Sequence, residues 1–317
     1  MSTGPTRARA ATEEKTGLRR DRSRPPAPEP LPHPVVDNHC HLDIADGPVA
    51  ASDVAGQGAA GGAWLDVTAA LAASTAAGVA RIVQIGCDLA GARWAVDVAE
   101  RYEQIVAGVA LHPNEAPRLA AQGELDMALR EIESLAQSSP RVRAVGETGL
   151  DFYRTAEDGR ASQEESFRVH IRLAQRLGKT LVIHDRDAHD DILRVLDDEG
   201  TPPRTVMHCF SGDADFARQC LDRGCWLSFA GTVTFAKAEH LREAVWVTPP
   251  DRLLVETDAP YLTPAPYRGR PNASYLVPHT VRAIAAVLGR DLEAVCREIE
   301  SATDEAYGGA WCRDDSA

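Results

Sequence analysis

Two histidines one residue apart, His39 and His41, follow the first apolar run of the chain at Val35–Val36. Alternate residues of a strand face the same side, so at a strand end these two imidazoles could bind one cation together. A His-x-His triplet also arises by chance on protein surfaces, and alone it leaves both interpretations open. Four further apolar runs end in a residue type that binds metals, and this repetition favours a metal site: Glu147, His184, His208 and Asp258.

Strand-like and helix-like segments alternate along the chain. The segments that predict strands are 35–36, 81–86, 105–111, 142–146, 180–183, 205–207, 225–229 and 252–256. The segments that predict helices are 64–77, 90–102, 125–136, 163–177, 190–199, 216–223, 238–246, 275–288 and 291–307. Regular alternation predicts a parallel sheet with right-handed crossovers, and eight units is the number at which such a sheet closes into a TIM (β/α)8 barrel. An open doubly wound sheet is the alternative, but no G-x-G-x-x-G follows the first strand.

The predicted barrel explains why the metal-binding residue types recur at strand ends. The active site of such a barrel lies at the C-terminal ends of its strands, which would bring all six side chains to one rim. Six donors exceed the needs of one cation with an open position and suit two divalent metals, with Glu147 between them. Taken singly, Glu147 or Asp258 could be a helix N-cap, and His184 or His208 a hydrogen-bonded rim residue.

Three more residues are predicted to contact a substrate. His112 follows the third strand and faces the rim, although a structural histidine before Pro113 is the alternative. Arg186 could donate a fork of hydrogen bonds to a phosphate, or it could pair with a neighbouring aspartate. Arg268 lies in the loop after the eighth strand, where barrels often bind phosphate. Cys209 follows His208, and we expect it to serve packing rather than catalysis.

Composition limits the class of protein. The chain has 317 residues, of which 44% are hydrophobic and 26% charged, and its net charge is −13. Such an acidic chain is unlike a module that coats nucleic acid by bulk electrostatics, although metals and a few arginines could still form a local phosphate site. Seven cysteines without a C-x-x-C pair argue against a disulfide framework. Neither a signal peptide nor an apolar stretch of ~20 residues is found, so we expect a cytoplasmic protein without a membrane partner.

The domain organisation follows from the same patterns. Residues 1–33 are rich in Arg, Pro, Ala and Glu, and we expect a disordered, solvated arm rather than a nucleic-acid contact. Residues 34–310 are predicted to form a single barrel domain, with a flexible tail at 311–317. A Gly/Ala-rich insertion at 44–62 would lie beside the rim.

Five motifs in order resemble the TatD family of metal-dependent hydrolases and deoxyribonucleases. They are Asp37–Asp43, Gly146–Asp151, Val182–Ala188, His208–Gly212 and Val255–Leu262. The resemblance extends from Val35 to about Tyr307. Thr148 and Asp185 depart from the usual pattern, and the acidic Asp185 could weaken phosphate binding.

The resemblance implies a TIM-type barrel, two divalent cations (Mg, Mn or Zn) and hydrolysis of phosphodiester bonds in DNA, like a 3'-5' exonuclease that uses metal-activated water. It assigns metal binding to the six rim residues, with Glu147 as the bridge, and we expect Asp258 to orient the water and take its proton. RNA is a further expected substrate. An acyl hydrolase, such as a D-aminoacyl-tRNA deacylase, is the alternative function, since a dinuclear centre also polarises an acyl carbonyl. A non-catalytic scaffold is disfavoured because no candidate ligand is missing, and a monomer is expected.

Overall fold

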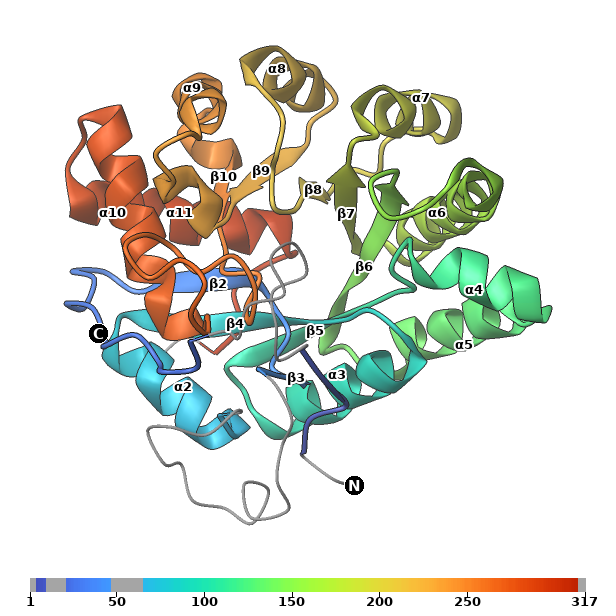
Figure 1. Ribbon diagram of the computed structural model, residues 1–317, viewed down its shortest axis with the longest axis horizontal. Helices are drawn as coiled ribbons and strands as arrows, with labels where there is room; N and C mark the ends of the chain where they lie inside the picture. Colours follow the sequence, from blue (N-terminus) through green and yellow to red (C-terminus); the bar gives the residue numbers. More distant parts are fainter. Residues whose placement is uncertain (1–3, 10–20, 47–64, 313–317) are drawn as a thin grey trace.

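The computed structural model describes residues 4–9, 21–46 and 65–312 (Figure 1). Most of the insertion expected at 44–62, and the tail from 313 onward, therefore lie outside the described residues. Within these ranges no helix combines the length and the apolar character needed to cross a bilayer.

Eight parallel strands form one sheet that curves into a nearly closed barrel, which confirms the predicted fold. The strands, in their order around the sheet, are β10 (Leu253–Val255), β9 (Trp226–Phe229), β8 (Thr205–Met207), β7 (Thr180–Arg186), β6 (Val142–Asp151), β5 (Ile105–Val109), β4 (Val79–Gly86) and β2 (Val35–Cys40). The two end strands meet through a parallel bridge between Cys40 and Ala259. The Asp258 amide also donates a hydrogen bond of 2.9 Å to the carbonyl of His39. The closure therefore joins two of the predicted ligand segments.

Helices cover the outside of the ring of strands (Figure 1). They are α2 (Val67–Ala76), α3 (Leu89–Arg101), α4 (Glu115–Gln122), α5 (Leu125–Ser138), α6 (Glu157–Leu177), α7 (His189–Glu199), α8 (Ala214–Asp222), α9 (Glu239–Val247), α10 (Val277–Leu288) and α11 (Leu292–Ala306). Three 3-10 helices are present among the described residues: η1 (Gly231–Thr234), η2 (Pro250–Arg252) and η3 (Ser274–Leu276). Sequence patterning missed α4, and it placed the start of α6 six residues too late.

The core divides into two layers because strand residues alternate between the barrel interior and the helices. The interior cluster takes residues from each strand, including Val36, Val106, Val182 and Trp226. At the N-terminal end of the strands this cluster continues into the C-terminal segment, where Trp311 is 4% exposed. Residue 311 is thus packed rather than part of a flexible tail, because its ring joins the interior cluster and its indole N–H donates to the Gln104 carbonyl at 3.0 Å.

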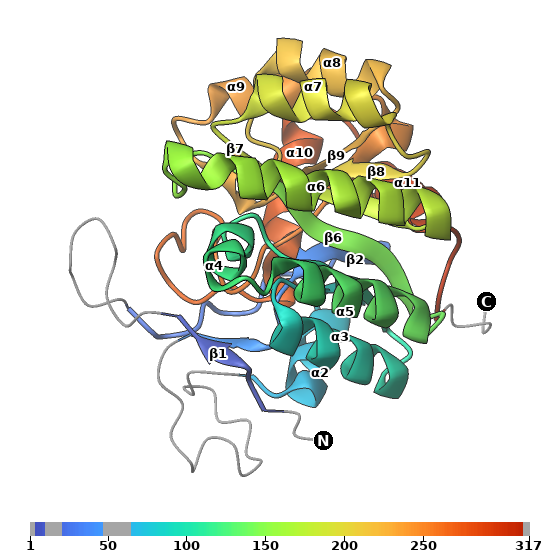
Figure 2. The same ribbon diagram turned by 90° about the vertical axis from the view of Figure 1, so that its right-hand side faces the viewer.

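The N-terminal segment also differs from the expected disordered arm where the structure describes it. Strand β1 (Arg7–Ala8) pairs in parallel with β3 (Ile44–Ala45), forming a separate two-stranded sheet outside the barrel (Figure 2). Further along, Leu31 is 7% exposed and the Tyr275 hydroxyl donates to the carbonyl of Pro25. Composition alone did not reveal these contacts, because they use backbone groups of the segment and partners distant in sequence.

Candidate metal centre

The barrel brings all six predicted ligands to one place at the C-terminal ends of its strands. His39 lies within β2, Glu147 within β6 and His184 within β7. His41, His208 and Asp258 lie just after β2, β8 and β10. Two strands run further than predicted, since β6 ends at Asp151 and β7 at Arg186.

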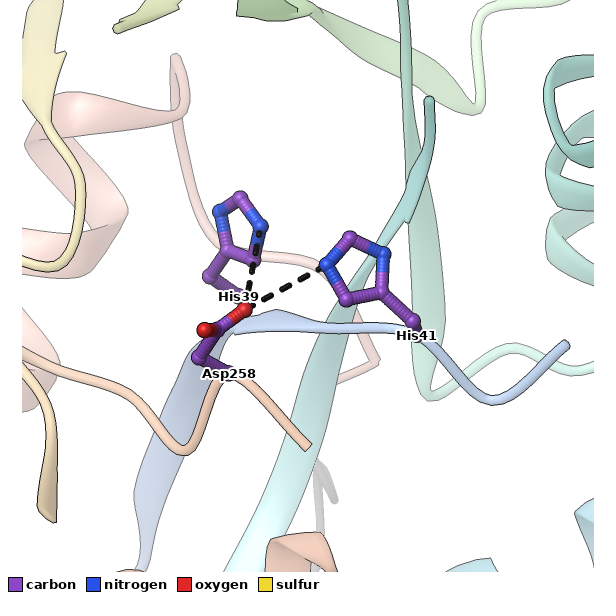
Figure 3. A group of neighbouring side chains, drawn as sticks. All are labelled: His39, His41 and Asp258. Atoms are coloured by element: carbon purple, nitrogen blue, oxygen red, sulfur yellow. Dashed lines mark ion pairs between the residues drawn. The ribbon is translucent and has the colours of Figure 1, made fainter. Parts of the chain in front are cut away.

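One group of predicted ligands combines residues from the first and last strands of the barrel. The carboxylate of Asp258 faces the imidazoles of His39 and His41 (Figure 3). Its Oδ1 lies 3.3 Å from His41 Nε2 and 4.0 Å from His39 Nε2. These three donor atoms lie close enough together to bind a single cation. His39 and His41 therefore lie beside a carboxylate that is more than 200 residues away in the sequence.

Glu147 stands between this group and a second one. Its Oε1 lies 3.8 Å from His39 Nε2 and 3.7 Å from His41 Nε2. Its Oε2 lies 3.2 Å from His184 Nδ1 and 2.7 Å from His208 Nε2. Each carboxylate oxygen thus faces a different pair of histidines.

Neighbouring groups orient the imidazoles. The Nδ1 of His41 donates to the carbonyl of Ile85 at 2.9 Å, which fixes its proton there and leaves Nε2 free to bind a metal. His208 Nδ1 lies 3.1 Å from Glu256 Oε1, and the same oxygen accepts from the Cys209 amide. Glu256 was not among the predicted site residues, although its position two before Asp258 in the same run is a usable signal. Cys209 is half-buried, and desolvation together with the charges of Asp258 and Glu256 raises the pKa of its thiol well above the usual range, which is consistent with a packing role.

The backbone at Asp258 is held in the left-handed region, with a φ of +54°. Aspartate tolerates this conformation better than most residues, but it is retained only where the surroundings enforce it. Two backbone hydrogen bonds hold this conformation. One runs from the Asp258 amide to the His39 carbonyl, and the other from the Tyr261 amide to the Asp258 carbonyl.

The electrostatics of the cluster suit a cation. Burial alone would raise the pKa of Glu147, but its electrostatic interactions with the imidazoles of His208, His112 and His39 hold it well below its usual range. Burial and the neighbouring His208 lower the pKa of His39, which favours the neutral imidazole that binds metals. Both ring nitrogens of His39 are buried without a hydrogen-bond partner among the described residues. Buried polar atoms without a hydrogen-bond partner destabilise the folded state, and a coordinated metal would provide a partner for Nε2. The residues present therefore fit divalent cations.

The structure adds residues that the sequence patterns did not single out. Cys87 directly follows β4, and its Sγ lies 3.0 Å from Glu147 Oε1. Asp151 ends β6, and its Oδ2 lies 3.5 Å from His184 Nε2. Cys87 carried a signal, since it is another metal-binding residue type at a strand end.

Of the three predicted substrate contacts, the structure brings His112 to the centre. Its ring centroid is 4.5 Å from that of His184, and its Nδ1 accepts from the Asn114 amide at 3.1 Å. Burial and the nearby His184 lower the pKa of His112 to about 3, so this imidazole is neutral near pH 7.

The two predicted arginines lie against aromatic rings. The guanidinium of Arg186 lies 3.9 Å from the ring centroid of Tyr153, and that of Arg268 lies 4.5 Å from that of Phe235. In the part of the chain that the structure describes, neither forms an ion pair with a rim ligand. The alternative ion pair of Arg186 with Asp185 or Asp187 is not formed among these residues either, and Asp185 instead bonds to His189 at 2.7 Å.

A parallel β/α barrel whose mouth collects histidines and carboxylates in this arrangement defines a metal-dependent hydrolase. Comparison with known proteins is consistent with this class. Residues 36–308 match the family of TatD-related DNases. The protein belongs to this TatD family of metal-dependent hydrolases.

Individual relatives cover most of the chain. It is 45% identical over 284 residues to a Mycobacterium tuberculosis H37Rv protein named "uncharacterized metal-dependent hydrolase TatD", covering 88% of this chain and 100% of the relative. It is 32% identical to the "3'-5' ssDNA/RNA exonuclease TatD" of Enterobacter lignolyticus, covering 77% of this chain and 94% of the relative. The crystal structure of the TatD homologue YJJV from Escherichia coli K12 superposes with a TM-score of 0.74 at 24% identity, covering 87% of this chain and 98% of that one. This last similarity supports the fold.

Proposed function

We propose that this protein hydrolyses phosphodiester bonds in single-stranded DNA or RNA, proceeding from the 3' end, with two divalent cations as cofactors. The observation that carries the proposal is the position of Glu147, whose two oxygens each face a separate pair of histidines. The name of the Enterobacter relative, an ssDNA/RNA exonuclease, supports this choice of substrate and polarity.

The proposed ligands divide between two ions. His39, His41 and Asp258 would hold one, His184 and His208 the other, and Glu147 would bridge them. Mixed histidine and carboxylate donors suit Zn²⁺ and Mn²⁺ and admit Mg²⁺. Bound divalent cations lower the pKa of water and neutralise charge on a phosphate.

The protein's own groups would manage the proton and the substrate. Asp258 is the group we propose as the base, because its Oδ1 faces the interior of the centre beside His41. Since His112 Nδ1 accepts from the Asn114 amide, its proton resides on Nε2, which can donate to a phosphate oxygen. Arg186 and Arg268 remain proposed phosphate contacts.

The acyl hydrolase alternative uses the same centre, but no observation on the described residues favours it, and the named activities of the relatives point to nucleic acid. The expectations of a monomer and of a cytoplasmic location stay predictions.

The direct test compares the protein with its Asp258→Asn variant. End-labelled single-stranded DNA and RNA and an acyl ester are incubated with Mg²⁺, Mn²⁺ or Zn²⁺, and cleavage products are followed over time. We expect stepwise shortening from the 3' end, no ester turnover, and a loss of at least ~100-fold in kcat for Asp258→Asn.

The matched control is Asp251→Asn, since Asp251 is an exposed aspartate on η2 and should leave kcat unchanged. Undiminished activity of Asp258→Asn would refute its role, and ester turnover without oligonucleotide cleavage would replace the proposed function with the alternative.

A further inference from the structure

The N-terminal strand lies against the mouth of the barrel. β1 pairs with β3, which begins three residues after His41. The Thr6 amide donates to the Asp43 carbonyl at 2.8 Å, and the Arg9 amide donates to the Ala45 carbonyl at 2.7 Å. The family match begins only at residue 36, so this strand is an addition to the matched part of the chain.

Arg9 attaches this strand to the loop that follows Asp258. Its guanidinium donates to the carbonyl of Pro260 at 2.6 Å and lies 3.3 Å from Asp46 Oδ1. It also lies 5.1 Å from the ring centroid of Tyr261. The ring of Tyr261 is in turn 6.3 Å from that of His41. β1 is therefore fixed beside the metal centre by contacts on both of its sides.

Arg7 makes fewer close polar contacts with the rest of the protein than Arg9 does. Its side chain is 39% exposed, and its sole ion-pair partner within the described ranges is Asp88, at 3.6 Å. This distance exceeds that of an N–H···O hydrogen bond. The other oxygen of Asp88 caps α3 by accepting from the Gly91 amide. The hydrogen-bonding capacity of the Arg7 guanidinium is thus largely unused.

The surroundings of Arg7 are acidic. Burial would lower the pKa of Arg7, but the acidic groups of Cys87 and Tyr261, with lesser effects from Asp43 and Asp88, raise it overall. Its ion-pair partner Asp88 directly follows Cys87, whose Sγ lies 3.0 Å from Glu147 Oε1, so Arg7 lies at the rim beside the centre.

We propose that Arg7 binds a phosphate of the substrate strand beside the metal centre, so that the N-terminal strand completes the substrate site. This inference rests on the proposed function, because it supplies the phosphate that Arg7 recognises. A guanidinium matches a phosphate with two parallel hydrogen bonds. It also offsets the repulsion that a polyanion would meet at a mouth carrying Asp43, Asp46 and Asp88 on a protein of net charge −13.

The test is an Arg7→Gln variant assayed on two phosphodiesters. One is a single-stranded oligonucleotide, which has phosphates on several nucleotides, and the other is bis(p-nitrophenyl) phosphate, which has only one. We expect kcat/KM for the oligonucleotide to fall about 10- to 100-fold, mainly through KM, and to fall much less for the small ester. The slope of log kcat/KM against log salt should become shallower by about 0.7, the effect of one lost phosphate contact on a single strand.

Two control variants separate substrate binding from a purely structural role. Asp88→Asn keeps the helix cap but removes the anionic partner of Arg7, so KM for the oligonucleotide should be no higher than that of the wild type. If Arg7 served only to hold β1 on the barrel through Asp88, Asp88→Asn would reproduce the defect of Arg7→Gln and overturn the proposal. Arg297→Gln removes an exposed charge on α11 and should change neither KM nor the salt slope.

The outcomes also distinguish this inference from the function on which it rests. If the wild type degrades the oligonucleotide while Arg7→Gln retains its KM and its salt slope, the role of Arg7 is refuted and the nuclease function stands. If the wild type cleaves neither phosphodiester, both are refuted.

Discussion

At the scale of single residues, Glu147 decides how the centre is divided. Glu147 is 4% exposed, and its carboxylate lies near histidines within β2 and β7 and just after β8. A carboxylate so deeply buried would be costly unless its charge were compensated. The four surrounding imidazoles must be neutral to bind metals, and neutral imidazoles compensate the charge of the carboxylate only in part. We therefore propose that two cations supply the rest of the compensation.

Replacing Glu147 by Gln tests this bridge. The amide keeps the size of the side chain but loses the charge and one acceptor oxygen, so the affinity for at least one ion should fall by more than ~100-fold. Metal content after dialysis and calorimetric titration with Mn²⁺ or Zn²⁺ measure the change. Glu131→Gln, at an ion pair on the surface of α5, should keep the wild-type stoichiometry. A Glu147→Gln protein that binds two ions with unchanged affinity would contradict the bridging role.

At the scale of elements, the pairing of β6 with β7 positions the second histidine group. The register places Gly149 opposite His184 and Asp151 opposite Arg186. Gly149 has a φ of +137°, and a Cβ at this position would lie 2.1 Å from the His184 carbonyl oxygen. The close approach of the two backbones therefore requires glycine, and it sets the position from which the His184 imidazole reaches Glu147.

Gly149→Ala should therefore destabilise the protein by more than about 2 kcal/mol and lower its activity, since both the conformation and the space are unfavourable for alanine. Urea unfolding followed by circular dichroism gives the free energy of unfolding. Gly123→Ala is the matched control, because Gly123 also has a positive φ, +71°, but no atom within 4 Å of the added Cβ. Gly123→Ala should lower the free energy of unfolding by about 1 kcal/mol and leave the activity unchanged. Equal costs for the two variants would show that the contact with β7 is unimportant.

At the scale of the whole molecule, the first and last strands of the barrel close the ring and assemble the first ligand group. Asp37 of β2 accepts from the Thr257 amide at 2.8 Å and from the Thr257 hydroxyl at 2.6 Å. Beside it, Asn38 donates to the Val255 carbonyl at 3.0 Å. These buried side chains connect β2 with the segment after β10, where backbone pairing is limited to a single bridge.

Asp37→Ala should cost about 2–4 kcal/mol in the free energy of unfolding, because it leaves the Thr257 amide buried without an acceptor. It should also weaken metal binding by His39 and Asp258, which lie on the two sides of the closure. Thermal unfolding and metal titration measure both effects. Asp251→Ala, at an exposed aspartate, should shift the free energy by no more than about 0.5 kcal/mol. A stable Asp37→Ala protein with normal metal affinity would show that the backbone contacts alone close the barrel.

Much of this architecture was predictable from local patterns. Alternating strand and helix segments determine a β/α barrel, because each pattern reflects burial on one face of an element. A barrel in turn brings the ends of its strands together, so the six candidate ligands at those ends could be predicted to lie near one another without any knowledge of distances. His112 followed from the same reasoning.

The sequence did not reveal the groups that act across long separations. Glu256 and Asp151, which contact the histidines, and Cys87 beside Glu147 are positioned by register and strand length, which local periodicity determines only to within a few residues. Arg186 and Arg268 are residues that can bind phosphate, and they lie near the C-terminal ends of strands. The position of each guanidinium, however, is set by an aromatic ring, that of Tyr153 and that of Phe235 respectively.

The sequence by itself determined the barrel and the residue types at its mouth, because hydrophobic periodicity and strand order are properties of the chain. Only the tertiary structure decided how Glu147 divides its two oxygens between the histidine pairs, and that β1 brings Arg7 to the rim beside Asp88. Both depend on backbone hydrogen bonds between distant segments, such as that from Thr6 to Asp43. Every backbone amide can make such bonds, so their pairing leaves little trace in composition or periodicity.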